Sequence, residues 1–154
     1  MITGTPFERL FLGGIRDAIG LSASNKLQIK TAINVSIEKT EPRGTGLTYV
    51  HLPLPDGDVV APWALERVLI AIARHIRTGR LLLHCAAGMS RSVAIASLYL
   101  HVVGYANYGE ALAAIATVRE VDVSPAMQRS VEKYLQHLAR EGSNASSHSR
   151  TSSQ

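Results

Sequence analysis

The sequence is poor in cysteine, in aromatic residues and in long apolar runs. Only one of its 154 residues is cysteine, and Phe, Trp and Tyr together make up 5%. A single cysteine excludes a disulfide within the chain and is typical of a reducing compartment. No apolar run approaches the length of a membrane span, and the first residues lack the apolar segment of a signal peptide. We therefore expect a cytoplasmic protein without membrane contact.

Charge is also modest, with 16 Lys and Arg against 12 Asp and Glu and a net charge of +4. The cations are scattered and do not alternate with aromatics, so no nucleic-acid partner is expected, although a basic surface suits anionic substrates. The histidines show no metal-ligand spacing, and we expect neither metal nor cofactor. The length predicts one domain, at residues 1–140, and a monomer. Residues 141–154 are polar and predict a disordered tail.

The most informative stretch is residues 80–93, where an apolar strand leads into a short loop and then a helix. It reads Arg-Leu-Leu-Leu-His-Cys-Ala-Ala-Gly-Met-Ser-Arg-Ser-Val. A loop whose N–H groups point inward, followed by the positive end of a helix dipole, binds a tetrahedral oxyanion. Phosphate, sulfate or vanadate would fit. The same groups favour an anionic thiol, so we expect Cys85 to be a thiolate nucleophile at neutral pH.

The residues that follow Cys85 suit this chemistry. Arg91 can hold two phosphate oxygens through its planar guanidinium, Gly88 permits close approach of the backbone, and Ser92 is placed to donate a hydrogen bond to the Cys85 sulfur. A lone cysteine is more often a small buried hydrophobe. The five matching neighbours, however, arise by chance on the order of once in a million. The predicted substrate-binding residues are Ala86, Ala87, Gly88, Met89, Ser90 and Arg91.

Residues 84–92, His-Cys-Ala-Ala-Gly-Met-Ser-Arg-Ser, resemble the active-site signature of the cysteine-dependent dual-specificity protein phosphatases. The similarity covers about residues 10–138. The resemblance implies a small atypical member reduced to its catalytic domain, which hydrolyses phosphotyrosine and phosphoserine or phosphothreonine through a cysteinyl-phosphate. Further segments follow the order of the family: Leu10-Phe-Leu-Gly13, Ile33-Asn34-Val35, Tyr49 with Leu52, Ser97-Leu-Tyr99-Leu, Glu110-Ala-Leu112, Val118-Arg119 and Ser124-Pro125.

The alternation of strand-like and helix-like segments predicts an α/β fold. We expect a central, mostly parallel twisted sheet of four to five strands flanked by helices on both faces. Residues 47–52 are expected beside the strand that carries Cys85. The predicted strands are 10–13, 31–35, 47–52 and 81–84; a polar loop is expected over 38–46; and helices are expected after Ser22 or Ser24, after Pro62, over 90–103, after Asn107 and after Ser124.

A general acid is expected on the loop at residues 53–58, because prolines and a glycine prevent both strand and helix there. The loop carries two carboxylates, Asp56 and Asp58. The spacing Tyr49-x-x-Leu52-x-x-x-Asp56 is similar to that of the family's general acid, which favours Asp56. Either carboxylate can instead cap the helix after Pro62, a role that suits Asp58 better.

Three further residues have open roles. As a strand residue, His84 should point away from the nucleophile and support the loop through buried hydrogen bonding. Asn34 either braces the loop or satisfies the end of its own strand. Arg119 matches an arginine of the family, although a salt bridge at a helix end explains it equally well.

The loop side chains also bear on the substrate. Ala86 and Ala87 are small and neutral where related lipid phosphatases carry lysines, so the resemblance favours phosphorylated proteins as substrates. Two alternatives stay open: a phosphatase acting on phosphoinositides or RNA 5′-triphosphates, and a non-catalytic phosphate-binding adaptor.

Overall fold

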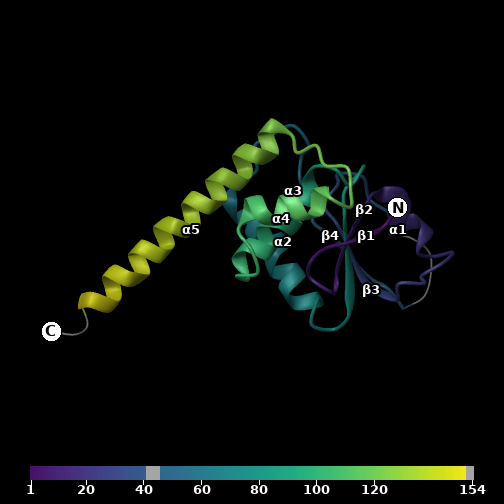
Figure 1. The fold of residues 1–154 in the computed structure, drawn as a ribbon, viewed down its shortest axis with the longest axis horizontal. Helices are drawn as coiled ribbons and strands as arrows, with labels where there is room; N and C mark the ends of the chain where they lie inside the picture. The colour runs from purple at the N-terminus through teal and green to yellow at the C-terminus, as the bar shows by residue number, and fades with distance from the viewer. Residues whose placement is uncertain (41–45, 152–154) are drawn as a thin grey trace.

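The computed structural model describes residues 1–40 and 46–151, with side chains described up to residue 145. The sequence-predicted loop over 38–46 lies partly outside these residues. Figure 1 shows the described elements grouped around one sheet, with the last helix projecting from it. In chain order the elements are β1 (Thr3–Gly4), β2 (Leu10–Gly13), α1 (Ile15–Gly20), β3 (Ile29–Asn34), β4 (Thr48–His51), α2 (Pro62–His75), β5 (Arg80–His84), α3 (Arg91–Val102), α4 (Tyr108–Ala116) and α5 (Pro125–Thr151).

The five strands form one sheet in the order β1-β2-β5-β3-β4. Only β1 and β2 pair antiparallel, and the other neighbours are parallel, as predicted. At the end of β5, His84 lies between Gly13 of β2 and Asn34 of β3. The carboxyl ends of three parallel strands therefore meet at one edge, where the loop after β5 begins.

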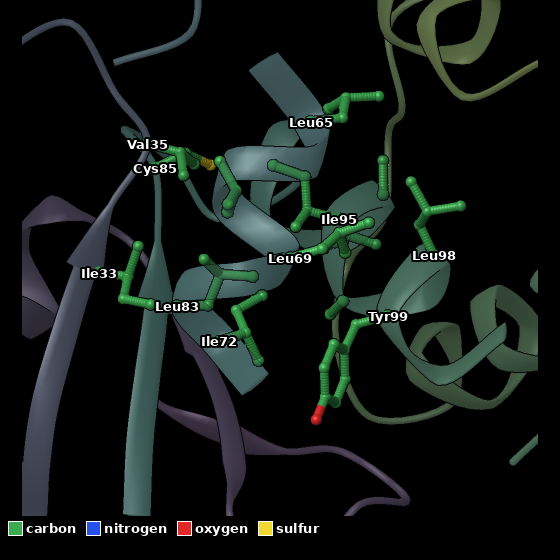
Figure 2. Close-up of a cluster of buried hydrophobic side chains, with 14 of the residues drawn as sticks. Ile33, Val35, Leu65, Leu69, Ile72, Leu83, Cys85, Ile95, Leu98 and Tyr99 are labelled. Carbon is green, nitrogen blue, oxygen red and sulfur yellow. The ribbon is translucent and has the colours of Figure 1, made fainter. Parts of the chain in front are cut away.

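Both faces of the sheet are covered, as the alternating side chains of β5 require. Leu81 and Leu83 pack into the larger core, which is formed with α2, α3, α4 and α5. Leu82 points to the opposite face, where it packs with Ala18 of α1 and Ile29 of β3. Figure 2 shows part of the larger core, with side chains of β3, β5, α2 and α3 in contact.

The predicted starts of three helices are confirmed. Helix α3 begins after Ser90 and is buried on all sides through most of its length, which makes it the central helix. Asn107 caps α4 by accepting a hydrogen bond of 2.8 Å from the Glu110 N–H. Ser124 accepts one of 3.2 Å from Met127 N–H at the start of α5, where Pro125 is the first helical residue.

Two predictions were wrong. The short helix expected after Ser22 or Ser24 lies earlier, at Ile15–Gly20, because Gly14 and Asp17 form its N-terminal hydrogen bonds while Ile29 starts β3. The segment at 47–52 does form β4, but β3 separates it from β5. Strand order is not local information, since β4 pairs along β3 through main-chain hydrogen bonds that any sequence can make.

The C-terminal segment also differs from expectation. Helix α5 continues to Thr151, although residues 141–154 were expected to be disordered. Up to residue 145, where the described side chains end, Leu138 is the last one packed against the core, and residues 141–145 are exposed. Figure 1 shows this part of the helix standing away from the other elements. The division into a catalytic domain at 1–140 and a tail stays a prediction.

Candidate active site

The loop between β5 and α3 is curled around the sulfur of Cys85. The N–H of Gly88 donates a hydrogen bond to Sγ at 3.3 Å, and the Ser92 hydroxyl lies 3.3 Å from the same atom. Gly88 has φ = +73°, a conformation that side chains other than glycine rarely adopt. The inward N–H, the hydroxyl and the first turn of α3 thus converge on one sulfur atom, an environment that favours negative charge.

The turn between β2 and α1 supports this loop from behind. Ile15 N–H donates to the Ala86 carbonyl at 2.9 Å. A Cβ atom on Gly14 would lie 2.8 Å from that carbonyl oxygen, and one on Gly88 would lie 2.6 Å from the Gly13 oxygen. The backbone of the β2–α1 turn therefore contacts the backbone of the loop at these glycines. A residue with a side chain at either position would distort the loop.

Cys85 lies at the boundary between the core and the surface. Its exposed fraction is only 2%, and Figure 2 shows it beside Val35 above the core side chains of the strands. It also lines a surface hollow of about 340 Å³, together with the predicted substrate-binding residues except Gly88. One flank of the residue is thus packed while the other faces a space large enough for a phosphate group.

Arg91 connects this loop to the loop that follows β4. Its side chain is buried, and Nη1 donates a hydrogen bond of 3.0 Å to the Leu54 carbonyl. The Nη2 atom lies 3.8 Å from a carboxylate oxygen of Asp56. A guanidinium has five N–H donors, so these contacts leave donors for an oxyanion in the hollow.

The structure distinguishes the two candidate general acids by position. Asp56 lines the hollow and its side chain is 59% exposed, whereas Asp58 is not among the lining residues. Gly57 between them has φ = +94°, so the loop turns sharply there. This arrangement favours Asp56, which remains a proposal for the acid. Asp58 makes no capping bond at α2, whose N-cap is Ala61 without a side-chain hydrogen bond.

His84 is buried directly before the nucleophile candidate. Its Nδ1 lies 3.4 Å from the Cys85 carbonyl oxygen, and since a carbonyl only accepts, this contact places the proton on Nδ1. Burial lowers the pKa of His84 to about 4, against a smaller opposing effect of that hydrogen bond. The ring is therefore neutral at neutral pH.

We expect the stability of the domain to fall as the pH drops from about 6.5 to 4. The unfolded chain binds a proton at His84 below about 6.5, while the folded chain resists it until about 4, so the loss totals on the order of 3 kcal/mol. The free energy of unfolding, determined by denaturant titration at several pH values, measures this loss. His84→Gln should remove this part of the slope, and His75→Gln on α2 should keep it. An unchanged slope in His84→Gln would contradict the assignment.

The other two supporting residues contact different parts of the site. Asn34 accepts hydrogen bonds from the N–H and hydroxyl of Ser36 and donates to the Glu38 carbonyl, so it fixes the turn after its own strand. Arg119 donates to the Gly88 carbonyl at 2.6 Å and also to carbonyls of Met1 and Leu12. Arg119 thus braces the loop through backbone carbonyls, and its charge also helps to lower the pKa of the Asp17 carboxyl group.

Sequence reasoning missed one wall of the hollow. Asp122, Ser124 and Pro125 also line it; the first two belong to the connection between α4 and α5, and Pro125 is the first residue of α5. Ser124 and Pro125 were interpreted as a helix start and as part of the family resemblance, but not as lining residues. Asp122 gave no signal, because a single acidic residue in a polar connection is typical of any surface.

Among the side chains described in residues 1–40 and 46–145, no group of three or more His, Cys, Asp or Glu is placed to hold a metal ion. In the same residues no helix combines the length and the apolar character that a membrane crossing needs.

A parallel α/β sheet, a cysteine in a curled loop and an arginine at the following helix define the class of cysteine-dependent phosphatase domains. The sequence model for "Dual specificity phosphatase, catalytic domain" matches residues 10–136. The chain belongs to this family.

Individual relatives agree with this assignment. Mouse dual specificity protein phosphatase 18 is 40% identical over 91 residues, which cover 53% of this chain and 47% of the relative. The chain thus spans about half the length of that relative. Human DUSP28 has the same fold, with a TM-score of 0.79, 23% identity and coverage of 92% of this chain and 99% of that one. A mouse protein assigned to the dual specificity phosphatases, in complex with zinc tungstate, has a TM-score of 0.75 and 25% identity, covering 87% and 86%.

Proposed function

We propose that the domain hydrolyses phosphotyrosine and phosphoserine or phosphothreonine in proteins through a cysteinyl-phosphate. The observation that carries the proposal is the convergence on one hollow of the Cys85 sulfur, the Arg91 guanidinium and the Asp56 carboxyl group. Membership of the dual specificity phosphatase family supports it.

In the first step, the Cys85 thiolate attacks phosphorus, an S–P bond forms and the P–O bond to the substrate breaks. Asp56 gives its proton to the departing oxygen. The loop N–H groups and Arg91 stabilise the charge on the transferring group, which is the main requirement of phosphoryl transfer. The exposed position of Asp56 lets a protein-bound phosphate enter beneath it.

In the second step, water attacks the phosphorus of the cysteinyl-phosphate and the S–P bond breaks. Asp56, now ionised, takes a proton from the water, and inorganic phosphate leaves. The hydroxyl of Ser92, 3.3 Å from the sulfur, can donate to the departing thiolate. Every step uses only water and groups of this chain.

The walls of the hollow support a phosphoprotein substrate. Ala86 and Ala87 contribute no charge, and the lining includes no lysine among the described residues. A polyphosphorylated head group therefore finds Arg91 as its sole cationic partner in this lining. We also propose that the protein acts as a monomer in the cytoplasm, where a reducing environment keeps the single cysteine a thiol.

The function is tested by measuring phosphate release from a panel of substrates. We expect turnover of 4-nitrophenyl phosphate and of peptides carrying phosphotyrosine, phosphoserine and phosphothreonine, with inhibition by vanadate. Activity on phosphotyrosine alone would contradict dual specificity. Turnover restricted to phosphoinositide vesicles or triphosphorylated RNA would favour those substrates instead. Phosphate binding without any turnover would identify an adaptor.

A further inference from the structure

Asp122 stands on the rim of the hollow, held there by hydrogen bonds to the loop. Its own N–H donates to the Met89 carbonyl at 3.0 Å. On either side, Arg119 donates to the Gly88 carbonyl at 2.6 Å and the Ser124 N–H donates to the Ser90 hydroxyl at 3.0 Å. These three bonds fix the backbone of residues 119–124 against the loop. Asp122 therefore has a defined position relative to a phosphate bound there.

The carboxylate of Asp122 is exposed and lacks an ion-pair partner within the described part of the chain. Among the described residues, the acidic and basic side chains that line the hollow are Asp56, Arg91 and Asp122. Arg91 already contacts the Leu54 carbonyl and approaches Asp56. The rim is thus acidic, although the whole chain has a net charge of +4.

We propose that Asp122 selects phosphorylated segments with Lys or Arg beside the phosphorylated residue, and disfavours segments with a second phosphate or an acidic neighbour. This inference rests on the proposed function. The bound phosphate is held by N–H groups and Arg91, so the unpartnered carboxylate acts on what lies next to that phosphate. It attracts a cation there and repels an anion, because the neighbouring group of the substrate lies close to the carboxylate at the same rim.

The negative charge of this rim distinguishes phosphorylated proteins from phosphoinositides and RNA 5′-triphosphates as substrates. An inositol head group with several phosphates, or an RNA 5′-triphosphate, would bring additional negative charge against Asp122 as well as Asp56. A singly phosphorylated protein segment with a basic neighbour meets no such repulsion. The acidic rim therefore disfavours the binding of polyanionic substrates.

The test compares kcat/KM for three phosphotyrosine peptides that differ only in having Lys, Gln or Glu on both sides of the phosphotyrosine. In low salt we expect about a tenfold preference for the Lys peptide over the Glu peptide, shrinking as the ionic strength rises. The preference should fall to about threefold or less in Asp122→Asn and reverse in Asp122→Lys. Glu120→Gln is the matched control: it removes the same charge two residues away, outside the lining, and should keep the wild-type preference.

Failure of this inference can be told apart from failure of the proposed function. Wild-type protein that hydrolyses 4-nitrophenyl phosphate but shows no Lys preference would overturn the role of Asp122 alone. An equal loss of activity on all three peptides in Asp122→Asn, with the preference kept, would also overturn it, since that points to a structural role. Absence of hydrolysis of 4-nitrophenyl phosphate would overturn both.

Discussion

Replacing Cys85 by serine is expected to lower phosphate release by at least about 10⁴-fold, because a hydroxyl is a far weaker nucleophile than a thiolate at neutral pH. The exchange leaves the loop N–H groups and Arg91 in place, so the variant should still bind a phosphotyrosine peptide. Initial rates with 4-nitrophenyl phosphate measure the first effect. Calorimetric titration with the peptide measures the second.

A matched control for this experiment is Cys85→Ala, which removes the nucleophile without leaving a hydroxyl. Both variants should show the same residual rate and near wild-type thermal unfolding, since the side chain is small and adds little to the core. A Cys85→Ser protein that kept more than about 1% of the activity would show that another group attacks phosphorus, and the cysteinyl mechanism would be wrong.

The second large effect is expected for Asp56→Asn, and its size should depend on the leaving group. Loss of a general acid costs about 10²–10⁴-fold when the departing oxygen needs a proton. We therefore expect a loss of about 10³-fold with phenyl phosphate or a phosphoserine peptide. With 4-nitrophenyl phosphate the loss should be at least about tenfold smaller, because nitrophenolate leaves without full protonation.

Asp58→Asn is the matched control, since it removes an equal charge from the same loop outside the hollow. It should leave the dependence on the leaving group as in the wild type. If Asp58→Asn shows the selective loss and Asp56→Asn does not, the assignment of the acid is wrong and the loop must move on substrate binding.

The centre of the site could be predicted because its parts are adjacent in the sequence. Cys85, Gly88, Arg91 and Ser92 lie within one strand–loop–helix unit, so the motif alone places their polar groups together. The burial of β5 could also be predicted, because its three consecutive leucines place apolar side chains on both faces of the sheet. Local pattern and local geometry agree there.

The other parts of the fold and of the site depend on contacts between segments that lie far apart in the sequence. Strand β1 has only two residues, too few for a pattern, and it is paired because β2 offers it an edge. Arg119 reaches the loop across 31 residues of sequence, and the position of Asp122 follows from its hydrogen bond to Met89. Main-chain partners of this kind leave no signature in the side chains, so only the folded chain reveals them.

The position of Arg91 has a consequence for how the site responds to its ligand. Arg91 is the hydrogen-bond link to the Leu54 carbonyl, two residues before Asp56, and the proposed mechanism also makes it a contact for the oxyanion. Under that mechanism, binding of the oxyanion and ordering of the loop that carries Asp56 are thermodynamically linked, and each makes the other more favourable. An incoming phosphate monoester would thus help to assemble the machinery that cleaves it.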